Sequence, residues 1–531
     1  MPASFLHGVE VIETNVGPQP ITVVKSAVIG LVGTAPRWAV AAANPAGVAS
    51  GQTPTLVSSQ RDGTMFGPLI RGYSIPYALS AIQSQGSGQA IVVDVFNPST
   101  HNTPVVNQAF TMPASGPQVI NLGHMGIVGP GLAGGIYATS VVVKNSGGTT
   151  TYVENTDYTV DYINGVIAAK TGGAITAGEA LEISFNYCDP SKVQDSDLVG
   201  AVTAGVYTGI QALQTSYGLF GFFPKILVAP AFFAQNLLTA QIVGSQDATV
   251  AAALTTMAGT LHAVALIDAA VGTSVATALA NRSAANAAFN TSSHRAILCF
   301  PGENFYDTGV IPTGVTLNAA GAPVQAQINQ NTDSPLSQWM AGAMAAKDVA
   351  KGYWWSPSNT QVNGILGPDV TLYASLTDPN SDTDNLNASG IVTVFNAYGS
   401  GYRIWGNRSA AYPTFTDPAN FINIRRTLDV IEESVELAML QFVDQPITNA
   451  LITAVLASVN SFLRTLVGRG ALVGGSASYN PAENPASQLA AGQIVFDLSV
   501  MPPPPAERIT YNVFINTNLL SQLAASNAVT A

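Results

Sequence analysis

Five histidines and two cysteines are the side chains best suited to catalysis or metal binding in this 531-residue chain, and their spacing favours neither. Cys188 and Cys299 lie far apart, which excludes a Cys-based zinc site and a disulfide framework and is typical of a reducing compartment. The histidines stand in unrelated contexts, so a Ser-His-Asp grouping would have to form in three dimensions. They are His7, His101, His124, His262 and His294.

The motifs of nucleotide, zinc and hydrolase chemistry are absent from the sequence. There is no Gly-Lys pair and hence no Walker A phosphate loop, no His-Glu-x-x-His, and no Gly-x-Ser-x-Gly nucleophile elbow. We therefore expect no enzymatic activity, no cofactor and no metal.

Gly129, Gly131 and Gly134 match the spacing of a dinucleotide-binding fingerprint. That motif requires a strand that turns into a helix whose N-terminus holds the pyrophosphate. Residues 136–143, which follow, have the pattern of a strand, so we expect a plain glycine-rich loop.

Four residues resemble the first half of a calcium-binding loop. The sixth position, which needs glycine, is Thr383, and the twelfth, which needs a bidentate acid, is Ser389. We expect a solvated acidic loop, with an incidental cation site as the alternative. The four are Asp378, Asn380, Asp382 and Asp384.

The low charge is the most unusual property of the chain as a whole. Charged residues make up 9%, against about 25% in an average domain. Since charge keeps free monomers apart, so little of it indicates a membrane protein or a permanent assembly. The formal net charge of −12 argues against nucleic acid as a partner, because binding phosphates needs Lys and Arg.

One segment, residues 248–267, is free of charge and long enough to span a bilayer. It is rich in Ala and Thr, contains His262, and becomes strand-like at Ala263. A buried helix followed by a core strand is expected, and no secretory signal is visible in residues 1–11. We therefore predict no membrane insertion, which leaves assembly.

Short apolar strands alternate with helical stretches in two parts of the chain, which predicts a mostly parallel sheet covered on both faces. The region between them holds short alternating runs, with Asn164-Gly165 as a hairpin turn, and predicts an inserted all-β domain. Predicted strands are 27–33, 90–96, 225–229, 263–267 and 295–300, and predicted helices are 75–83, 198–214 and 273–289.

The last third begins with an amphipathic helix over residues 424–442. Its apolar face is Ile424, Leu428, Ile431, Val435, Met439 and Phe442. Its charged face is Arg425, Arg426, Asp429, Glu432, Glu433 and Glu436. The apolar face is expected to be core, and the charged face is either solvated or a docking surface. A second helix follows Pro446 and ends near Gly468, and strands 493–500 and 508–516 flank a four-proline connector.

Both ends of the chain have strand-like segments with no local partner. A strand of this kind frays or pairs with another sheet. The candidate arm residues are Val9, Val11 and Ile12 near the start, and Ile509, Tyr511, Val513 and Ile515 near the end.

Several stretches resemble contractile-tail bacteriophage tail sheath proteins, in that family's order along the chain. They are "PASFLHGVEVIE", "AVIGLVGTAPRW", "SPSNTQVNGILGPD", "LNASGIVTVFNAYGSGYRIWGNRSA", "FINIRRTLDVIEESV" and "AERITYNVFINT". Related sheaths of pyocins and type VI secretion systems share the core.

The resemblance implies a multidomain α/β protein with a subtilisin-like α/β core domain, without protease function, an inserted all-β domain and an α+β C-terminal domain. We expect an N-terminal arm (1–25), the core domain in two parts (26–96 and 191–405), the inserted domain (97–190), the C-terminal domain (406–516) and a C-terminal arm (517–531).

The resemblance also implies function. Sheath subunits form hexameric rings stacked helically around a tail tube, joined by arms that pair with neighbouring sheets, and contraction drives the tube through the host envelope. The implied partners are further copies of the chain and the tail tube, baseplate and tail terminator proteins, in a virion assembled in the host cytoplasm. A helix of the C-terminal domain faces the tube, which gives the charged face of 424–442 as the candidate contact. Alternatives are the sheath of a pyocin-like or other contractile injection system, another viral assembly protein, or a hydrolase.

Overall fold

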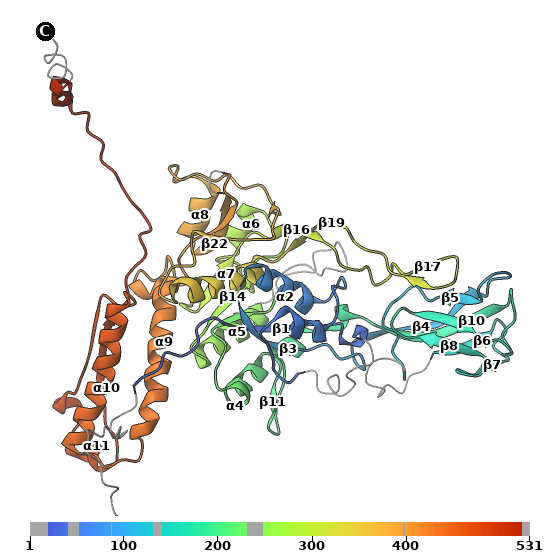
Figure 1. Cartoon of the computed structure of the whole chain (residues 1–531), viewed down its shortest axis with the longest axis horizontal. Helices are drawn as coiled ribbons and strands as arrows, with labels where there is room; N and C mark the ends of the chain where they lie inside the picture. Colours follow the sequence, from blue (N-terminus) through green and yellow to red (C-terminus); the bar gives the residue numbers. More distant parts are fainter. Residues whose placement is uncertain are drawn as a thin grey trace, which may run out of the picture.

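The computed structural model describes residues 20–40, 52–86, 88–130, 141–230, 248–396 and 399–522. A central α/β part lies between a β-rich part at one end and a pair of long helices at the other, and the C-terminal segment stands off the body (Figure 1). The predicted arm residues Val9, Val11 and Ile12 lie outside the described residues, as do Gly131 and Gly134.

The centre is a nine-stranded sheet. Its strands from β3 to β22 run parallel. At the edges, β2 pairs antiparallel with β3, β23 with β22, and β20 with β23. In spatial order the strands are β2 (Thr55–Val57), β3 (Gln89–Asp94), β1 (Val28–Gly33), β13 (Ile226–Val228), β14 (Val264–Asp268), β15 (Ala296–Cys299), β22 (Ile391–Asn396), β23 (Tyr402–Trp405) and β20 (Thr360–Gln361).

Both faces of this sheet are buried, which explains the continuous apolar runs of its strands. In β1, Val28 and Val32 belong to the hydrophobic cluster on one face, and Ile29 and Leu31 to the cluster on the other. Helix α5 (Ala248–Thr260) covers the first face. Helices α2 (Ser74–Ser84) and α7 (Leu336–Lys351) cover the second.

The β-rich part lies between β3 and the next helix of the chain and has its own hydrophobic cluster. A turn at Gly165 (φ +66°) joins β8 to β9, as the Asn164-Gly165 pair predicted. One sheet contains β4 (Asn102–Thr111), β10 (Ala180–Cys188), β6 (Val142–Asn145) and β7 (Thr151–Tyr152). The other contains β5 (Val119–Asn121), β9 (Val166–Ala169) and β8 (Tyr158–Asp161).

The C-terminal part pairs α9 (Ile422–Met439) with α10 (Asn449–Gly468) around a small apolar cluster. Strands β24 (Gly474–Ser478) and β25 (Asp497–Met501) form a two-stranded sheet beside α10. By length and composition, α10 could cross a membrane, and 28% of its apolar window is buried here. The membrane candidate predicted from the sequence was residues 248–267, and not this helix.

Two predicted helices are wrong. Residues 198–214 are not one helix, because three glycines with positive φ interrupt it: Gly200, Gly205 and Gly209. The region contains instead the end of α3 (Asp195–Val199), the hairpin β11–β12 (Val202–Thr203, Val206–Tyr207) and the 3-10 helix η5 (Gly209–Thr215). The helix predicted for 273–289 is reduced to α6 (Val275–Ala280). Residues 508–516 pair with no strand among the described residues, and their pairing with another subunit stays a prediction. The segment 248–267 does form a helix followed by a core strand, as expected.

The ends of α10 also differ from the prediction. Thr448 caps the helix by accepting a hydrogen bond from the amide of Leu451, so Pro446 lies before its first turn. The left-handed residue after the helix is Gly470 (φ +77°), not Gly468.

Candidate functional site

Part of the charged face of α9 is packed against the central domain, so the solvated-face interpretation is wrong for Arg426, Asp429 and Glu433. Arg426, Asp429 and Glu433 expose 4%, 2% and 5% of their surface. Each of the three forms an ion pair with a residue from another part of the chain. This pairing compensates for the cost of burying a charge.

Two ion pairs bring distant segments onto this face. Arg426 donates from Nη1 and Nη2 to the carboxylate of Asp348 on α7, at 2.8 and 2.5 Å. Lys225, just before β13, pairs with Glu433. Burial lowers the pKa of Lys225, and the carboxylate of Glu433 opposes that shift.

A chain of further contacts continues along the helix. The carboxylate of Asp429 accepts from Arg295 at 2.7 Å and from Arg425 at 2.8 Å. Glu432 accepts from Arg425 at 2.9 Å and lies 3.3 Å from Nδ1 of His262. The contact with His262 lowers the pKa of Glu432 to about 2, and the same contact raises the pKa of His262.

The six residues predicted to contact a tube therefore differ in how much of their side chain is exposed. Arg426, Asp429 and Glu433 offer almost no surface in this conformation, and the side chain of Arg425 is 16% exposed. The side chains of Glu432 and Glu436 are 40% and 63% exposed. Contact with a tube stays a prediction, now centred on these two glutamates.

Donor atoms of His262, Asp429 and Glu432 lie within 4.8 Å of one another, a spacing that could hold a metal ion. Both oxygens of Asp429 already accept hydrogen bonds from arginines. A cation at this position would compete with two guanidinium groups for the same carboxylate, and the residues form an ion-pair network.

The predicted acidic loop forms the start of a helix. Ser381 caps α8 (Asp382–Ala388) by accepting from the amide of Asp384. Asp378 accepts from the amide of Asn380, and Asp382 from the amide of Tyr373. The carboxylates thus satisfy backbone donors, in the pattern of turn and helix caps.

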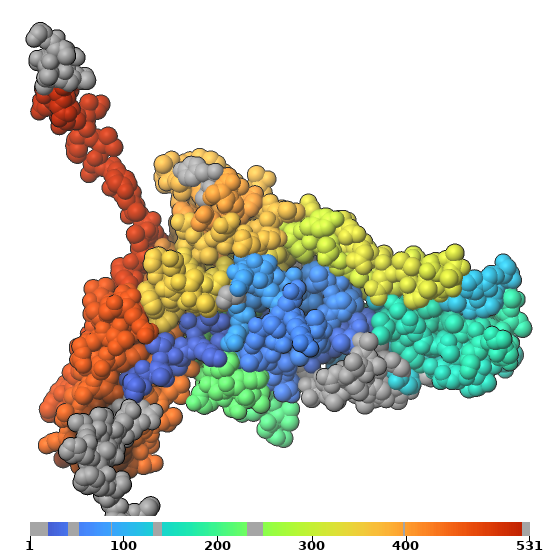
Figure 2. Space-filling view, in the orientation of Figure 1, coloured from blue at the N-terminus to red at the C-terminus, as the bar shows by residue number. Residues whose placement is uncertain are grey.

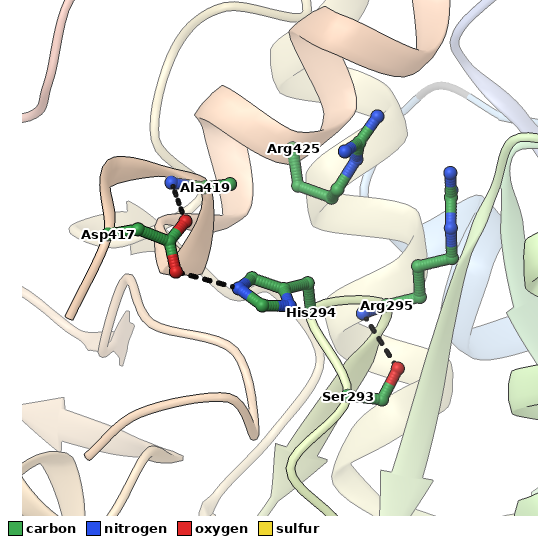
Figure 3. Close-up of a pocket in the computed structure, with 6 residues that line it drawn as sticks. All are labelled: Ser293, His294, Arg295, Asp417, Ala419 and Arg425. Atoms are coloured by element: carbon green, nitrogen blue, oxygen red, sulfur yellow. Dashed lines mark hydrogen bonds and ion pairs between the residues drawn. The ribbon is translucent and has the colours of Figure 1, made fainter. Parts of the chain in front are cut away.

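A polar pocket of about 400 Å³ lies where β15 begins and α9 approaches (Figure 3). His294 Nε2 and Asp417 Oδ2 are 3.1 Å apart, as in the acid–base half of a hydrolase triad. Ser293 Oγ, however, accepts from the amide of Arg295. The described residues of this pocket therefore have a His–Asp pair without a serine bonded to it.

The remaining histidines and the two cysteines form no common site among the described residues. His101 pairs with Asp197, and His124 stacks on Tyr187 at 3.8 Å. Cys188 and Cys299 are both buried and free. His7 lies outside the described residues.

The C-terminal arm, here residues 508–522, is the most exposed apolar segment described. Tyr511, Val513 and Ile515 expose 84%, 87% and 93% of their surface, and Ile509 exposes 68%. Figure 2 shows the arm as a single strand of chain projecting from the body. Strands β24 and β25 form a two-stranded sheet that packs against α10, and no third strand among the described residues extends it. The exposed arm and these open sheet edges are both features that pairing with another strand would complete.

Two domain models of one known family match more than half of the chain. Residues 205–410 match the phage tail sheath protein central domain, and residues 416–516 match the phage tail sheath C-terminal domain.

Individual relatives agree. The chain is 43% identical to the tail sheath protein of Burkholderia phage BcepMu over 530 residues, 99% of this chain and 100% of that protein. It is 28% identical to the tail sheath protein of Escherichia phage P2 over 62% of this chain and 73% of that protein. Its fold resembles the contracted helical sheath of the anti-feeding prophage, with a TM-score of 0.53 and 15% identity over 97% of this chain and 100% of that chain.

Proposed function

Since this chain belongs to the phage tail sheath family, a family of structural proteins of contractile tails, we propose that it polymerises as stacked hexameric rings around a tail tube and contracts to drive that tube through the host envelope. In this role it is a component of the virion. We further propose that it assembles in the host cytoplasm with tube, baseplate and tail terminator proteins as partners.

The observation that carries the proposal is the C-terminal arm, which pairs with no strand in the part of the chain that the structure describes. Ile509, Tyr511, Val513 and Ile515 alternate along extended chain and are each at least 68% exposed. Adding this strand to a sheet of a neighbouring subunit would bury those side chains and satisfy the free backbone groups. We propose the open edges of β24–β25 as the acceptor, joined there by the N-terminal arm of another copy.

We propose that the subunit moves as one rigid body made of three domains. We propose that residues 26–96 and 191–405 form a subtilisin-like core domain, that 97–190 are inserted into it, and that 406–516 form the C-terminal domain. The parallel order from β3 to β22, with helices on both faces, supports that core. The buried ion pairs of α9 would keep the C-terminal domain fixed to the core while subunits rotate.

The mechanism needs no nucleotide, because the free energy would be stored when the extended lattice assembles. Subunits released by the baseplate would rotate outward and form new lateral contacts, while arms anchored in neighbouring sheets keep the polymer connected. The sparse charge suits this change, since few charges have to be buried in either lattice.

A pyocin-like or other contractile injection system is the second candidate, favoured by the fold shared with the anti-feeding prophage sheath. The full-length identity to a phage sheath favours the phage tail. Electron microscopy of particles from the native source separates them, because a phage tail carries a DNA-filled head. Hollow tubes from the purified chain would support either sheath.

A further inference from the structure

The base of the C-terminal arm is joined to the body by the ion pair between Arg408 and Glu507. Arg408 Nε donates to Glu507 Oε1 at 2.8 Å, and Nη2 donates to Oε2 at 2.5 Å. In the described residues beyond Glu507, the hydrogen bonds join only residues of the arm itself. The last side-chain contacts of the arm with the body are therefore those of this pair. Figure 1 shows the segment that follows standing off the body.

Contacts other than the one with Glu507 also fix the position of the Arg408 side chain. Its guanidinium lies 4.2 Å from the ring centre of Tyr412 and 4.3 Å from that of Phe421. Its Nη1 donates to Oδ1 of Asn420, which is fully buried, at 2.9 Å. A planar guanidinium between two rings is pre-organised for a bidentate carboxylate, and lysine cannot reproduce that geometry.

The chain just before Glu507 is also constrained. Residues 502–505 are four consecutive prolines, which favour a stiff extended conformation. Asn423 at the start of α9 donates from Nδ2 to the carbonyl of Pro503 at 3.2 Å. The segment thus has two attachments to the body, at Pro503 and at Glu507, and two attachments define a direction.

From this geometry we infer that Arg408 and Glu507 are positioning residues that set the direction in which the C-terminal arm leaves the subunit. The inference rests on the proposed function, in which the arm adds to a sheet of a neighbour. Pre-orienting the arm lowers the entropy lost when it is captured. Without the pair, the arm would search a wider volume and bind more weakly.

The direct test measures the arm in the full-length unassembled chain. Spin labels on Asn512→Cys in the arm and Ala457→Cys on the exposed side of α10 report their separation by pulsed electron paramagnetic resonance. The native cysteines are buried and should not label. Glu507→Gln is expected to widen the distance distribution about twofold, and Arg408→Lys to do so in part. The matched control Glu483→Gln, an exposed glutamate away from the arm, should leave it unchanged. Equal widths in Glu507→Gln and the unmutated chain would overturn the inference.

A second measurement ties the pair to assembly. The lowest concentration at which tubes form should rise about tenfold in Glu507→Gln and stay unchanged in Glu483→Gln. An unchanged threshold in Glu507→Gln also overturns the positioning role. If the unmutated chain never forms tubes, the proposed function fails instead, and the distance distributions still decide the role of Arg408 and Glu507.

Discussion

Arg426 of α9 and Asp348 of α7 form a bidentate ion pair whose side chains are 4% and 2% exposed. The pair joins the C-terminal helix to the central domain, 78 positions apart in sequence. Arg426 Nη2 also donates to the carbonyl of Ser26, so one guanidinium connects α7, α9 and the segment that leads into β1.

Removing one partner of this pair should be costly. Asp348→Asn leaves the buried charge of Arg426 without its counterion, and we expect a loss of about 3–5 kcal/mol of unfolding free energy. Replacing both residues, as in Arg426→Met with Asp348→Leu, should recover much of that loss, because no unpaired charge remains. Urea unfolding of the unassembled chain measures both. A single variant as stable as the unmutated chain would show that the pair does not hold the two parts together.

Glu303 at the start of β16 (Glu303–Asp307) gives a pH prediction. It is fully buried, and neither carboxylate oxygen has a hydrogen-bond partner among the residues that the structure describes. Burial raises its pKa well above the usual value. The folded state therefore holds a proton that the unfolded state releases above its ordinary pKa of about 4.3. Its contribution to stability is complete below that pH and is lost as the pH rises towards the folded pKa.

Glu303→Gln should remove this pH dependence. The unfolding free energy of the variant, relative to the unmutated chain, is expected to rise between pH 5 and pH 8 by up to about 1.4 kcal/mol per pH unit. Denaturant titrations at several pH values measure the difference, with Glu483→Gln as the control. A difference that stays constant over this range would show that Glu303 is ionised in the folded chain.

The backbone of the C-terminal arm should matter for assembly and not for folding. Val513→Pro removes an amide that strand addition needs, and residue 513 is 87% exposed in the free chain. We expect an unchanged melting temperature and no tubes, whereas Val513→Ile should form tubes normally. Normal tubes from Val513→Pro would contradict strand addition by this segment.

The N-terminal arm makes a parallel prediction. Deleting residues 1–20 should abolish ordered polymer while circular dichroism and the melting temperature show that the core still folds. The deletion spares β1, which begins at Val28. Ordered tubes from the truncated chain would show that this arm does not join subunits.

The sequence predicted the elements that depend on local pattern. The run that contains Ile29 and Leu31 identified a strand buried on both faces, and the spacing of Ile424 and Ile431 identified α9. The role of the charged face could not be predicted, because the pattern does not show that Arg426 meets Asp348 or that Glu433 meets Lys225. The structural role of Arg282 could not be predicted either, because most of its contacts are also distant in sequence.

Arg282 shows how far tertiary contacts exceed local pattern. Its guanidinium has no carboxylate partner among the described residues and donates only to backbone carbonyls. These belong to Phe289, Thr291, Ser389, Ala410 and Tyr412. Nothing near Arg282 in sequence indicates this role. The C-terminal arm differs, because local pattern did indicate its conformation. Its alternating apolar residues predicted a strand, and no described residue of the chain pairs with it.

The most direct test of a sheath subunit joined by its arms is electron microscopy of the purified full-length chain over a range of concentrations. We predict hollow, striated tubes built from six-membered rings. Particles that remain monomeric under every condition, or that close into shells or flat sheets, would contradict the account.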